Sequence, residues 1–170
     1  MLTLIIGGAG SGKSAFAEAL AKRLSGTGIY LATMKAEDPE SLQRIERHRR
    51  QRAGLGFATV ERAVGLSEAE IPAGANVLLE DLSNLLANEI FSPEGGGPEA
   101  VRRGLAALAD RCEHLTVVSN EVFSGGDAYE GETLAYMEHL ARLNRKLAAR
   151  ADLVVEVLCG LPNVLKGELP

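Results

Sequence analysis

The stretch Gly7-Gly8-Ala9-Gly10-Ser11-Gly12-Lys13-Ser14 decides the fold that we expect for this chain. It fits the pattern G-x-x-x-x-G-K-[ST] at every position, and it joins a short apolar run, Leu2–Ile6, to a stretch of helical periodicity, Lys13–Leu24. Glycines let backbone N–H groups curl around an anion, and a helix N-terminus adds partial positive charge. The stretch therefore predicts a phosphate-binding loop, and with it a nucleotide enzyme that uses ATP or GTP.

Particular side chains of this stretch have expected roles. Lys13 is placed to reach the β- and γ-phosphates, and the Ser14 hydroxyl is placed to ligate Mg²⁺. A second apolar run, Val77–Leu79, ends in Glu80 and Asp81, the expected form of an acidic position that supports the metal. The residues alone do not decide whether Glu80 or Asp81 supports the metal. The alternative for the whole stretch is an ordinary glycine-rich turn.

Length and composition limit the class of protein. The chain has 170 residues, of which 46 % are hydrophobic and 24 % charged, and this predicts one globular domain spanning residues 1–170. A net charge of −5 argues against broad attraction to nucleic acid or anionic lipid. No apolar run approaches the roughly 18 residues of a membrane span, and the start lacks a signal peptide pattern. We therefore expect a cytoplasmic protein with no membrane span and no nucleic-acid partner, its two cysteines buried as free thiols.

Short apolar runs alternate with longer helical patterns, which is typical of a parallel α/β sheet with helices on both faces. The expected strands are Leu2–Ile6, Ile29–Thr33, Val77–Leu79, Leu115–Ser119 and Leu153–Leu158, with weaker edge candidates at Phe57–Glu61 and Asn163–Lys166. The expected helices are Lys13–Leu24, Pro39–Arg52, Asp81–Phe91, Pro98–Cys112 and Glu130–Arg150.

A basic segment, Arg44–Arg52, contains a histidine at position 48. Helix spacing aligns Arg44, His48 and Arg52, and neighbouring cations favour the neutral imidazole, which can attack phosphorus. Arginines in the same segment can hold a triphosphate by bidentate contacts. The alternative is a solvated basic face with an incidental histidine. The Asn-Lys-x-Asp motif of GTPase switch proteins does not occur, which argues against a regulatory GTPase.

Several segments, taken in order, resemble one family. They are Gly7–Ser14, Tyr30-Leu31-Ala32-Thr33, Arg44-Ile45-Glu46-Arg47-His48-Arg49, Leu78-Leu79-Glu80-Asp81 with Asn88, Asn120-Glu121-Val122, and Asn144 with Ala148–Asp152. With them the chain resembles the adenosylcobinamide kinase / adenosylcobinamide-phosphate guanylyltransferase family of cobalamin biosynthesis. The resemblance spans nearly the whole sequence.

The resemblance implies a RecA-like P-loop fold, a homo-oligomer that is often a trimer, and two reactions that use Mg²⁺ with ATP and GTP. A nucleoside triphosphate phosphorylates the aminopropanol hydroxyl of adenosylcobinamide or a related corrinoid. GTP then transfers GMP onto that phosphate through a covalent guanylyl-histidine, which falls on His48. The resemblance adds Thr33, Arg44 and Arg49 to the nucleotide contacts and puts Glu80 before Asp81.

The segment after Val122 departs from the family pattern. The chain has Phe123-Ser124-Gly125-Gly126-Asp127-Ala128-Tyr129 where the family usually has Gly-x-Gly-Ile-Val-Pro. Asn120 and Glu121 stand at the expected carboxyl end of a strand, where open α/β sheets bind ligands, so we expect them to meet the corrinoid. A turn and helix-capping pair is the alternative for these two residues.

Two other functions remain open at this point. One is a P-loop kinase of a small alcohol that lacks guanylyltransferase activity. The other is a nucleotide-binding regulatory protein without transfer chemistry. His114 and His139 are expected to be structural or exposed. Tyr129 and Tyr136 are candidates to line a substrate cleft, and amphipathic helix packing is the alternative for Tyr136.

Overall fold

In the computed structural model, residues 1–35, 42–43, 46, 56–125 and 129–170 are described. The strands are β1 (Leu2–Gly7), β2 (Gly28–Ala32), β3 (Ala58–Glu61), β4 (Asn76–Glu80), β5 (His114–Asn120), β6 (Leu153–Leu158) and β7 (Leu161–Lys166). The helices are α1 (Lys13–Ala21), the short 3₁₀ helix η1 (Leu66–Glu68), α3 (Leu82–Phe91), α4 (Gly97–Arg111) and α5 (Gly131–Arg150). The expected helix Pro39–Arg52 falls almost entirely outside the described residues.

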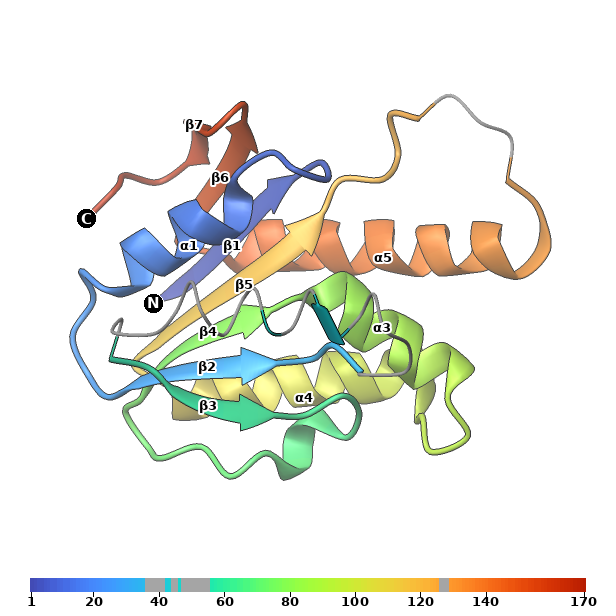
Figure 1. The fold of residues 1–170 in the computed structure, drawn as a ribbon, viewed down its shortest axis with the longest axis horizontal. Coiled ribbons are helices and arrows are strands. Elements are labelled where there is room, and N and C mark those ends of the chain that lie inside the picture. Colours follow the sequence, from blue (N-terminus) through green and yellow to red (C-terminus); the bar gives the residue numbers. More distant parts are fainter. Residues whose placement is uncertain (36–41, 44–45, 47–55, 126–128) are drawn as a thin grey trace.

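The described strands form one seven-stranded sheet in the order β3-β2-β4-β5-β1-β6-β7 (Figure 1). Every pairing is parallel except that of β6 with β7, which is antiparallel. The sequence-based prediction of a mostly parallel sheet is therefore confirmed, and both weak strand candidates lie at its edges. Because β1 has β5 on one side and β6 on the other, the loop after β1 emerges from the middle of the sheet's carboxyl edge.

Helices cover both faces of the sheet because alternate residues of each strand point to opposite sides. Leu78 on β4 packs in one buried cluster with Ala17 and Leu20 of α1. Its neighbour Leu79 packs in the other cluster with residues of α3, α4 and α5, such as Leu85. These continuous apolar runs form a parallel sheet that is buried on both sides.

The first helix ends earlier than predicted, at Ala21 rather than Leu24. The next residues form tighter turns, with the Leu24 N–H donating to the Ala21 carbonyl at 3.2 Å. The buried Asn76 side chain also donates to the Ala21 carbonyl, at 2.6 Å. A side chain more than fifty residues away in sequence therefore satisfies the end of the helix, and local periodicity carries no sign of it.

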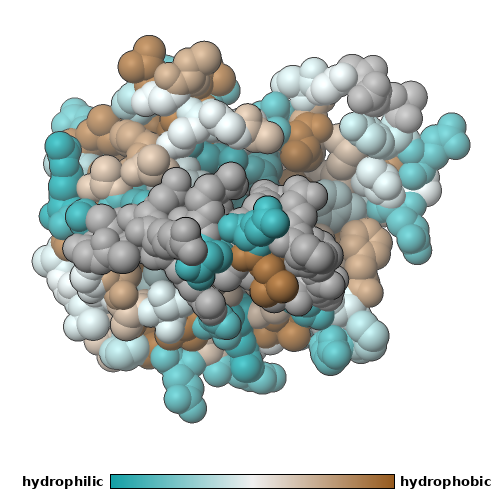
Figure 2. Space-filling model, in the orientation of Figure 1, coloured by the Kyte–Doolittle hydropathy of each residue, from teal (hydrophilic) through white to brown (hydrophobic). Residues whose placement is uncertain are grey.

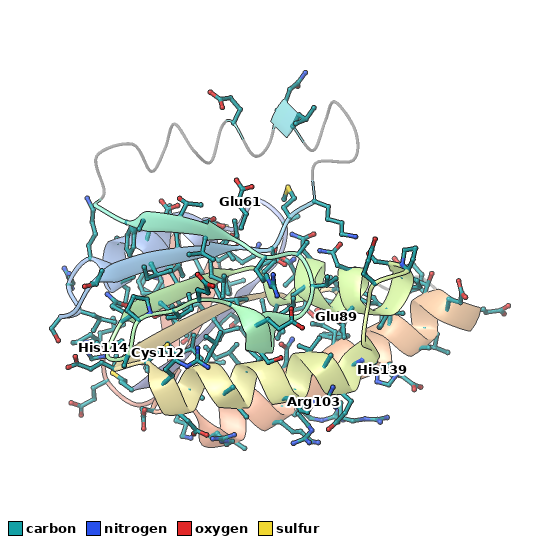
Figure 3. All side chains as sticks on the ribbon, turned by 90° about the horizontal axis from the view of Figure 1, so that it is seen from below. Glu61, Glu89, Arg103, Cys112, His114 and His139 are labelled. Carbon is teal, nitrogen blue, oxygen red and sulfur yellow. The ribbon has the colours of Figure 1, made fainter. Side chains whose placement is uncertain are left out.

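Two loops at the carboxyl end of the sheet are joined through Glu89 of α3 (Figure 3). One carboxylate oxygen of this buried residue accepts a hydrogen bond from the Gly65 N–H at 2.7 Å, and the other accepts from the Gly96 N–H at 2.6 Å. The carboxylate thus satisfies two backbone N–H groups, which need an acceptor when they are removed from water. Glu89 therefore connects the segment after β3 to the turn before α4.

We predict that Glu89→Gln lowers the free energy of unfolding by about 2 kcal/mol, because the amide keeps one acceptor and turns an N–H₂ group toward the other backbone donor. Urea denaturation measures the change. Glu70→Gln is the matched control, since Glu70 is exposed. Equal stability of both variants would show that the two hydrogen bonds contribute little.

Candidate nucleotide site

The loop between β1 and α1 is a compact turn. The Ser11 N–H donates to the Gly8 carbonyl at 3.2 Å, and Gly12 precedes the helix with φ of 90°. No described side chain caps the start of α1, so its first N–H groups remain available to an anion. The predicted strand–loop–helix context is confirmed.

The first glycine of the loop has no room for a side chain. A Cβ atom at Gly7 would lie 2.5 Å from the Ser11 Oγ and 2.7 Å from the Val157 carbonyl oxygen of β6. Both distances are shorter than real Cβ contacts, so any larger residue must displace the loop or the neighbouring strand. The motif therefore requires glycine here because of close packing.

Lys13 begins α1 and folds back over the loop. Its side chain is buried, with 8 % of its surface exposed, and its Nζ donates to the Gly8 carbonyl at 3.2 Å. The ammonium group therefore lies against the backbone that is expected to surround a phosphate. Its position agrees with the phosphate-binding role that the motif predicts.

Ser14 and Glu80 meet across the site, one from the start of α1 and the other from the end of β4. The Ser14 hydroxyl donates to the Glu80 Oε1 at 2.6 Å. The Glu80 Oε2 is buried and has no hydrogen-bond partner within the described part of the chain. Burial raises the pKa of Glu80 to about 7, while the Ser14 hydrogen bond lowers it and the charge of Asp81 raises it. A buried carboxylate with one open oxygen is suited to a cation.

Asp81 has a different environment, although it is the next residue. It caps α3, with Oδ1 accepting from the Asn84 N–H at 2.7 Å and Oδ2 accepting from the Asn84 side chain at 3.0 Å. Burial raises the pKa of Asp81, and the Asn84 hydrogen bond and the nearby Lys13 charge oppose that shift. Both Asp81 oxygens are thus engaged in holding the helix, whereas Glu80 keeps one oxygen open.

The donor set fits magnesium. Within the described residues, no three side chains of His, Cys, Asp or Glu gather into a metal cage. Magnesium does not require one, because it commonly binds through one or two carboxylates together with substrate phosphates and water. The Ser14 hydroxyl and the open oxygen of Glu80 are oxygen donors beside the phosphate loop.

Thr33 lies behind the acidic pair, directly after β2. It is fully buried, and its Oγ1 accepts from the Asp81 N–H at 2.8 Å and lies 3.0 Å from the Glu80 carbonyl oxygen. The Asn88 side chain in turn donates to the Thr33 carbonyl at 2.8 Å. These contacts with the protein's own backbone hold Glu80 and Asp81 in place. The nucleotide contact expected of Thr33 stays a prediction.

Asn120 and Glu121 also lie beside the phosphate loop. The Glu121 N–H donates to the Gly7 carbonyl at 3.0 Å, and the Asn120 side chain hydrogen-bonds Asp81. The Glu121 Oε1 accepts from the Phe123 N–H at 2.8 Å, which is the local turn that the sequence left as an alternative. The two residues are therefore at the carboxyl edge, as expected, and their contacts here are within the protein.

Other predicted residues have simpler outcomes. Arg44, His48 and Arg49 lie outside the described residues. His114 is half-buried near Ser25 and Glu113, at the end of the sheet opposite Glu89 (Figure 3). The expectation of two buried thiols is wrong, since Cys112 is half-buried and Cys159 is exposed in the turn between β6 and β7. The turn directs the Cys159 side chain toward solvent. The apolar composition of the neighbouring strands does not predict this.

Ser83 is a site residue that the sequence did not indicate. Its hydroxyl accepts from the Asn120 N–H at 3.1 Å, and its carbonyl accepts from the Tyr136 hydroxyl at 3.2 Å. It therefore links the start of α3 to β5 and α5. Its place two residues after Asp81 is the one available sequence signal, and serine is common in a first helical turn.

The strand–loop–helix unit, the buried lysine and the facing Ser14–Glu80 pair define a P-loop nucleotide-binding protein. The family model described as "Cobinamide kinase / cobinamide phosphate guanyltransferase" matches residues 3–165, and the chain belongs to this family. Its class is accordingly that of a kinase and guanylyltransferase of cobalamin biosynthesis.

Named relatives match along their whole length. The chain is 33 % identical to the "Bifunctional adenosylcobalamin biosynthesis protein CobP" of Pseudomonas aeruginosa, over 99 % of each chain. It is 32 % identical to the "Bifunctional adenosylcobalamin biosynthesis protein CobU" of Escherichia coli, over 98 % of this chain and 100 % of that one. The corresponding protein of Salmonella typhimurium is 31 % identical over the same shares.

Two solved structures align over 96 % of this chain. The P4 protein of bacteriophage phi6 in complex with ADP gives a TM-score of 0.45 at 14 % identity, over 52 % of its own chain. An ATPase of a bacterial type III secretion system gives a TM-score of 0.45 at 15 % identity, over 56 % of its chain. Among the described helices, none has the length and apolar character needed to cross a bilayer.

We predict that the metal-free protein loses stability as the pH rises from about 4.5 to about 7, through Glu80. Because its pKa is raised in the folded state, the folded protein holds this proton over that range while the unfolded chain releases it. The contribution is on the order of 3 kcal/mol at most. Chemical denaturation at several pH values, compared with Glu80→Gln, measures it.

The exposed Glu138 of α5 provides the control substitution, Glu138→Gln. It should leave the pH dependence of the free energy of unfolding as in the unmodified chain. A Glu80→Gln variant with the same pH dependence as the unmodified chain would contradict the prediction.

Proposed function

We propose that this chain carries out both reactions of its family at the carboxyl edge of its sheet, with the phosphate loop, Lys13, Ser14 and Glu80 as the nucleotide site. The observation that carries the proposal is the direct Ser14–Glu80 hydrogen bond beside the buried Lys13. Simple nucleotide binding does not need a buried acid at that place. Phosphoryl transfer is helped by one, because an acid there can hold the Mg²⁺ that would neutralise charge on the transferred group.

In the kinase step, the cobinamide hydroxyl attacks the γ-phosphorus of ATP or GTP, and the bond to the nucleoside diphosphate breaks. The backbone N–H groups of Gly10–Ser14 and the Lys13 ammonium hold the phosphate oxygens in place. Ser14 and Glu80 would hold Mg²⁺, which supplies charge neutralisation at the β- and γ-phosphates when bound. Asp81 keeps its helix-capping role and supports Glu80 from the next position.

In the guanylyl step, the His48 imidazole attacks the α-phosphorus of GTP and pyrophosphate leaves. A phosphate oxygen of cobinamide phosphate then attacks the same phosphorus, and the histidine is released. Two displacements replace one encounter between two anions. Arg44 and Arg49 bind the triphosphate in this proposal, and the support for all three residues is the sequence resemblance.

The corrinoid is proposed to lie beside Asn120 and Glu121. Their position supports this, because Glu121 is hydrogen-bonded to Gly7 at the start of the phosphate loop and Asn120 contacts Asp81. A hydroxyl bound there approaches the terminal phosphate of a nucleotide on the loop. The adenosylated form is the substrate that the relatives' names favour.

We predict that Lys13→Ala removes the kinase activity and that His48→Ala separates the two reactions. Lys13→Ala loses kinase activity by at least about 100-fold, because a charged contact to the transferred phosphate is removed. His48→Ala keeps the kinase but loses GMP transfer and the acid-labile, base-stable label left by α-labelled GTP. Gel analysis of the label and product chromatography measure these outcomes.

Lys146→Ala and His139→Ala, both on α5, are the matched controls and should behave like the unmodified chain. Near-normal phosphorylation by Lys13→Ala would remove Lys13 from the site. An active enzyme that takes up no label from GTP would favour the alternative of a kinase without guanylyltransferase activity.

A homo-oligomer is also part of the proposal, with β7 as the contact between copies. Apolar residues of this edge strand and of the end of β6 are exposed, namely Leu158, Leu161, Val164 and Leu165. Brown, apolar atoms gather at the top of Figure 2, where Figure 1 draws the β6–β7 hairpin. No described strand pairs with the outer edge of β7, and an open apolar edge is normally covered.

We predict that the protein sediments as an oligomer and that Leu161→Glu shifts it toward the monomer, since a charge would be buried in the contact. Sedimentation velocity measures both. Leu134→Glu, which changes an exposed leucine on α5, should leave the oligomer intact. A monomeric wild-type protein, or an unchanged Leu161 variant, would rule out this contact. A trimer is the size that the family resemblance implies.

A further inference from the structure

The turn between β6 and β7 lies directly against the phosphate loop. The Gly160 N–H donates to the Ser11 carbonyl at 2.8 Å, and a Cβ atom on Gly12 would lie 3.1 Å from the Gly160 Cα. The β6 backbone also approaches the start of the loop, with the Val157 carbonyl 2.7 Å from the Cβ position of Gly7. Figure 1 shows the tip of this hairpin beside the loop after β1.

The contact fixes the direction of one peptide group in the loop. A trans peptide is planar, so the carbonyl of one residue and the N–H of the next point in opposite directions. Because the Ser11 carbonyl points to Gly160, the Gly12 N–H points away from the hairpin. If this peptide rotated by half a turn, the Gly12 N–H would point toward the hairpin. The Ser11 carbonyl oxygen would then point to the side that the Gly12 N–H now faces. An anion would then meet an acceptor in place of a donor.

The turn is built to hold this position. Cys159 and Gly160 both have positive φ, 51° and 79°, as in the two-residue turns that match the twist of a hairpin. The residues on either side, Leu158 and Leu161, are paired across the β6–β7 ladder. The N–H of Gly160 is therefore placed by a closed hairpin rather than by a free loop.

We propose that the Cys159–Gly160 turn is a positioning element for nucleotide binding, which acts by orienting the Ser11–Gly12 peptide of the phosphate loop. The turn touches no phosphate itself. The inference rests on nucleotide binding by this loop, as proposed above. It adds the C-terminal hairpin to the parts of the chain on which nucleotide affinity depends.

Thermodynamic linkage gives the proposal a second consequence. If the turn favours the loop conformation that binds nucleotide, bound nucleotide must stabilise the turn's hydrogen bond by the same factor. Hydrogen exchange at the Gly160 amide should therefore slow when Mg²⁺ and ATP are added to the wild-type protein.

The test compares Gly160→Ala with Gly74→Ala. Both glycines have positive φ, 79° and 72°, and neither has an atom within 4 Å of an added Cβ, so alanine introduces similar backbone strain at each. Each also donates its N–H to a carbonyl, but Gly74 bonds Arg111 at the opposite end of the sheet. Isothermal titration calorimetry with a non-hydrolysable ATP analogue, in which an imido group replaces the β–γ bridging oxygen, and Mg²⁺ gives Kd for the wild type and both variants.

We expect similar thermal midpoints for the two variants and a Kd for nucleotide raised roughly three- to tenfold in Gly160→Ala alone. KM for cobinamide should not change, whereas KM for ATP should rise in parallel with Kd. Equal Kd in all three proteins, equal weakening in both variants, or no nucleotide-dependent protection at Gly160 would overturn the proposal. Absence of nucleotide binding by the wild type would instead overturn the proposed function, and this inference with it.

Discussion

Everything in the site depends on keeping opposite charges close together where water is largely excluded. Glu80 leaves the central strand β4 and meets the Ser14 hydroxyl, while Lys13 lies in the same region with its ammonium on the loop backbone. Burial alone opposes the ionised form of Glu80, and its hydrogen bond and the nearby lysine only partly offset that effect. The site is thus incomplete without a cation and an anion from outside. Its open carboxylate oxygen and its helix N-terminus are complementary to a metal-bound phosphate chain.

A second set of polar contacts holds the two acidic residues, Glu80 and Asp81, in place. Thr33, fully buried after β2, is hydrogen-bonded to the backbone at Glu80 and Asp81, and Asn88 holds Thr33 from α3. Asp81 fixes the start of that same helix. These contacts join two neighbouring strands and a helix through side-chain hydrogen bonds. They explain how Thr33 and Asp81 can be buried at this edge, since their polar side-chain atoms have partners.

The sequence predicted the phosphate loop, the order of the strands along the chain and the acidic strand end, because each has a strong local pattern. It could not predict what distant segments contribute. Asn76 of β4 satisfies the end of α1, Ser83 connects three elements, and Thr33 hydrogen-bonds the backbone at Glu80 and Asp81. Cys159 was expected to be buried, yet it occupies an exposed hairpin turn. Such features depend on which strands become neighbours, and hydrophobic periodicity does not encode sheet order.

The placement of β1 has a consequence for how the protein is made. This strand is synthesised well before both of its partners, which are β5, from His114, and β6, from Leu153. The phosphate loop therefore has neither flanking strand until β5 has been made, and only one of the two until β6 has been made. Contacts of such long sequence separation form slowly. A nascent chain stalled before Leu153 would carry the complete nucleotide motif and still lack β6, one of the two strands that flank the loop.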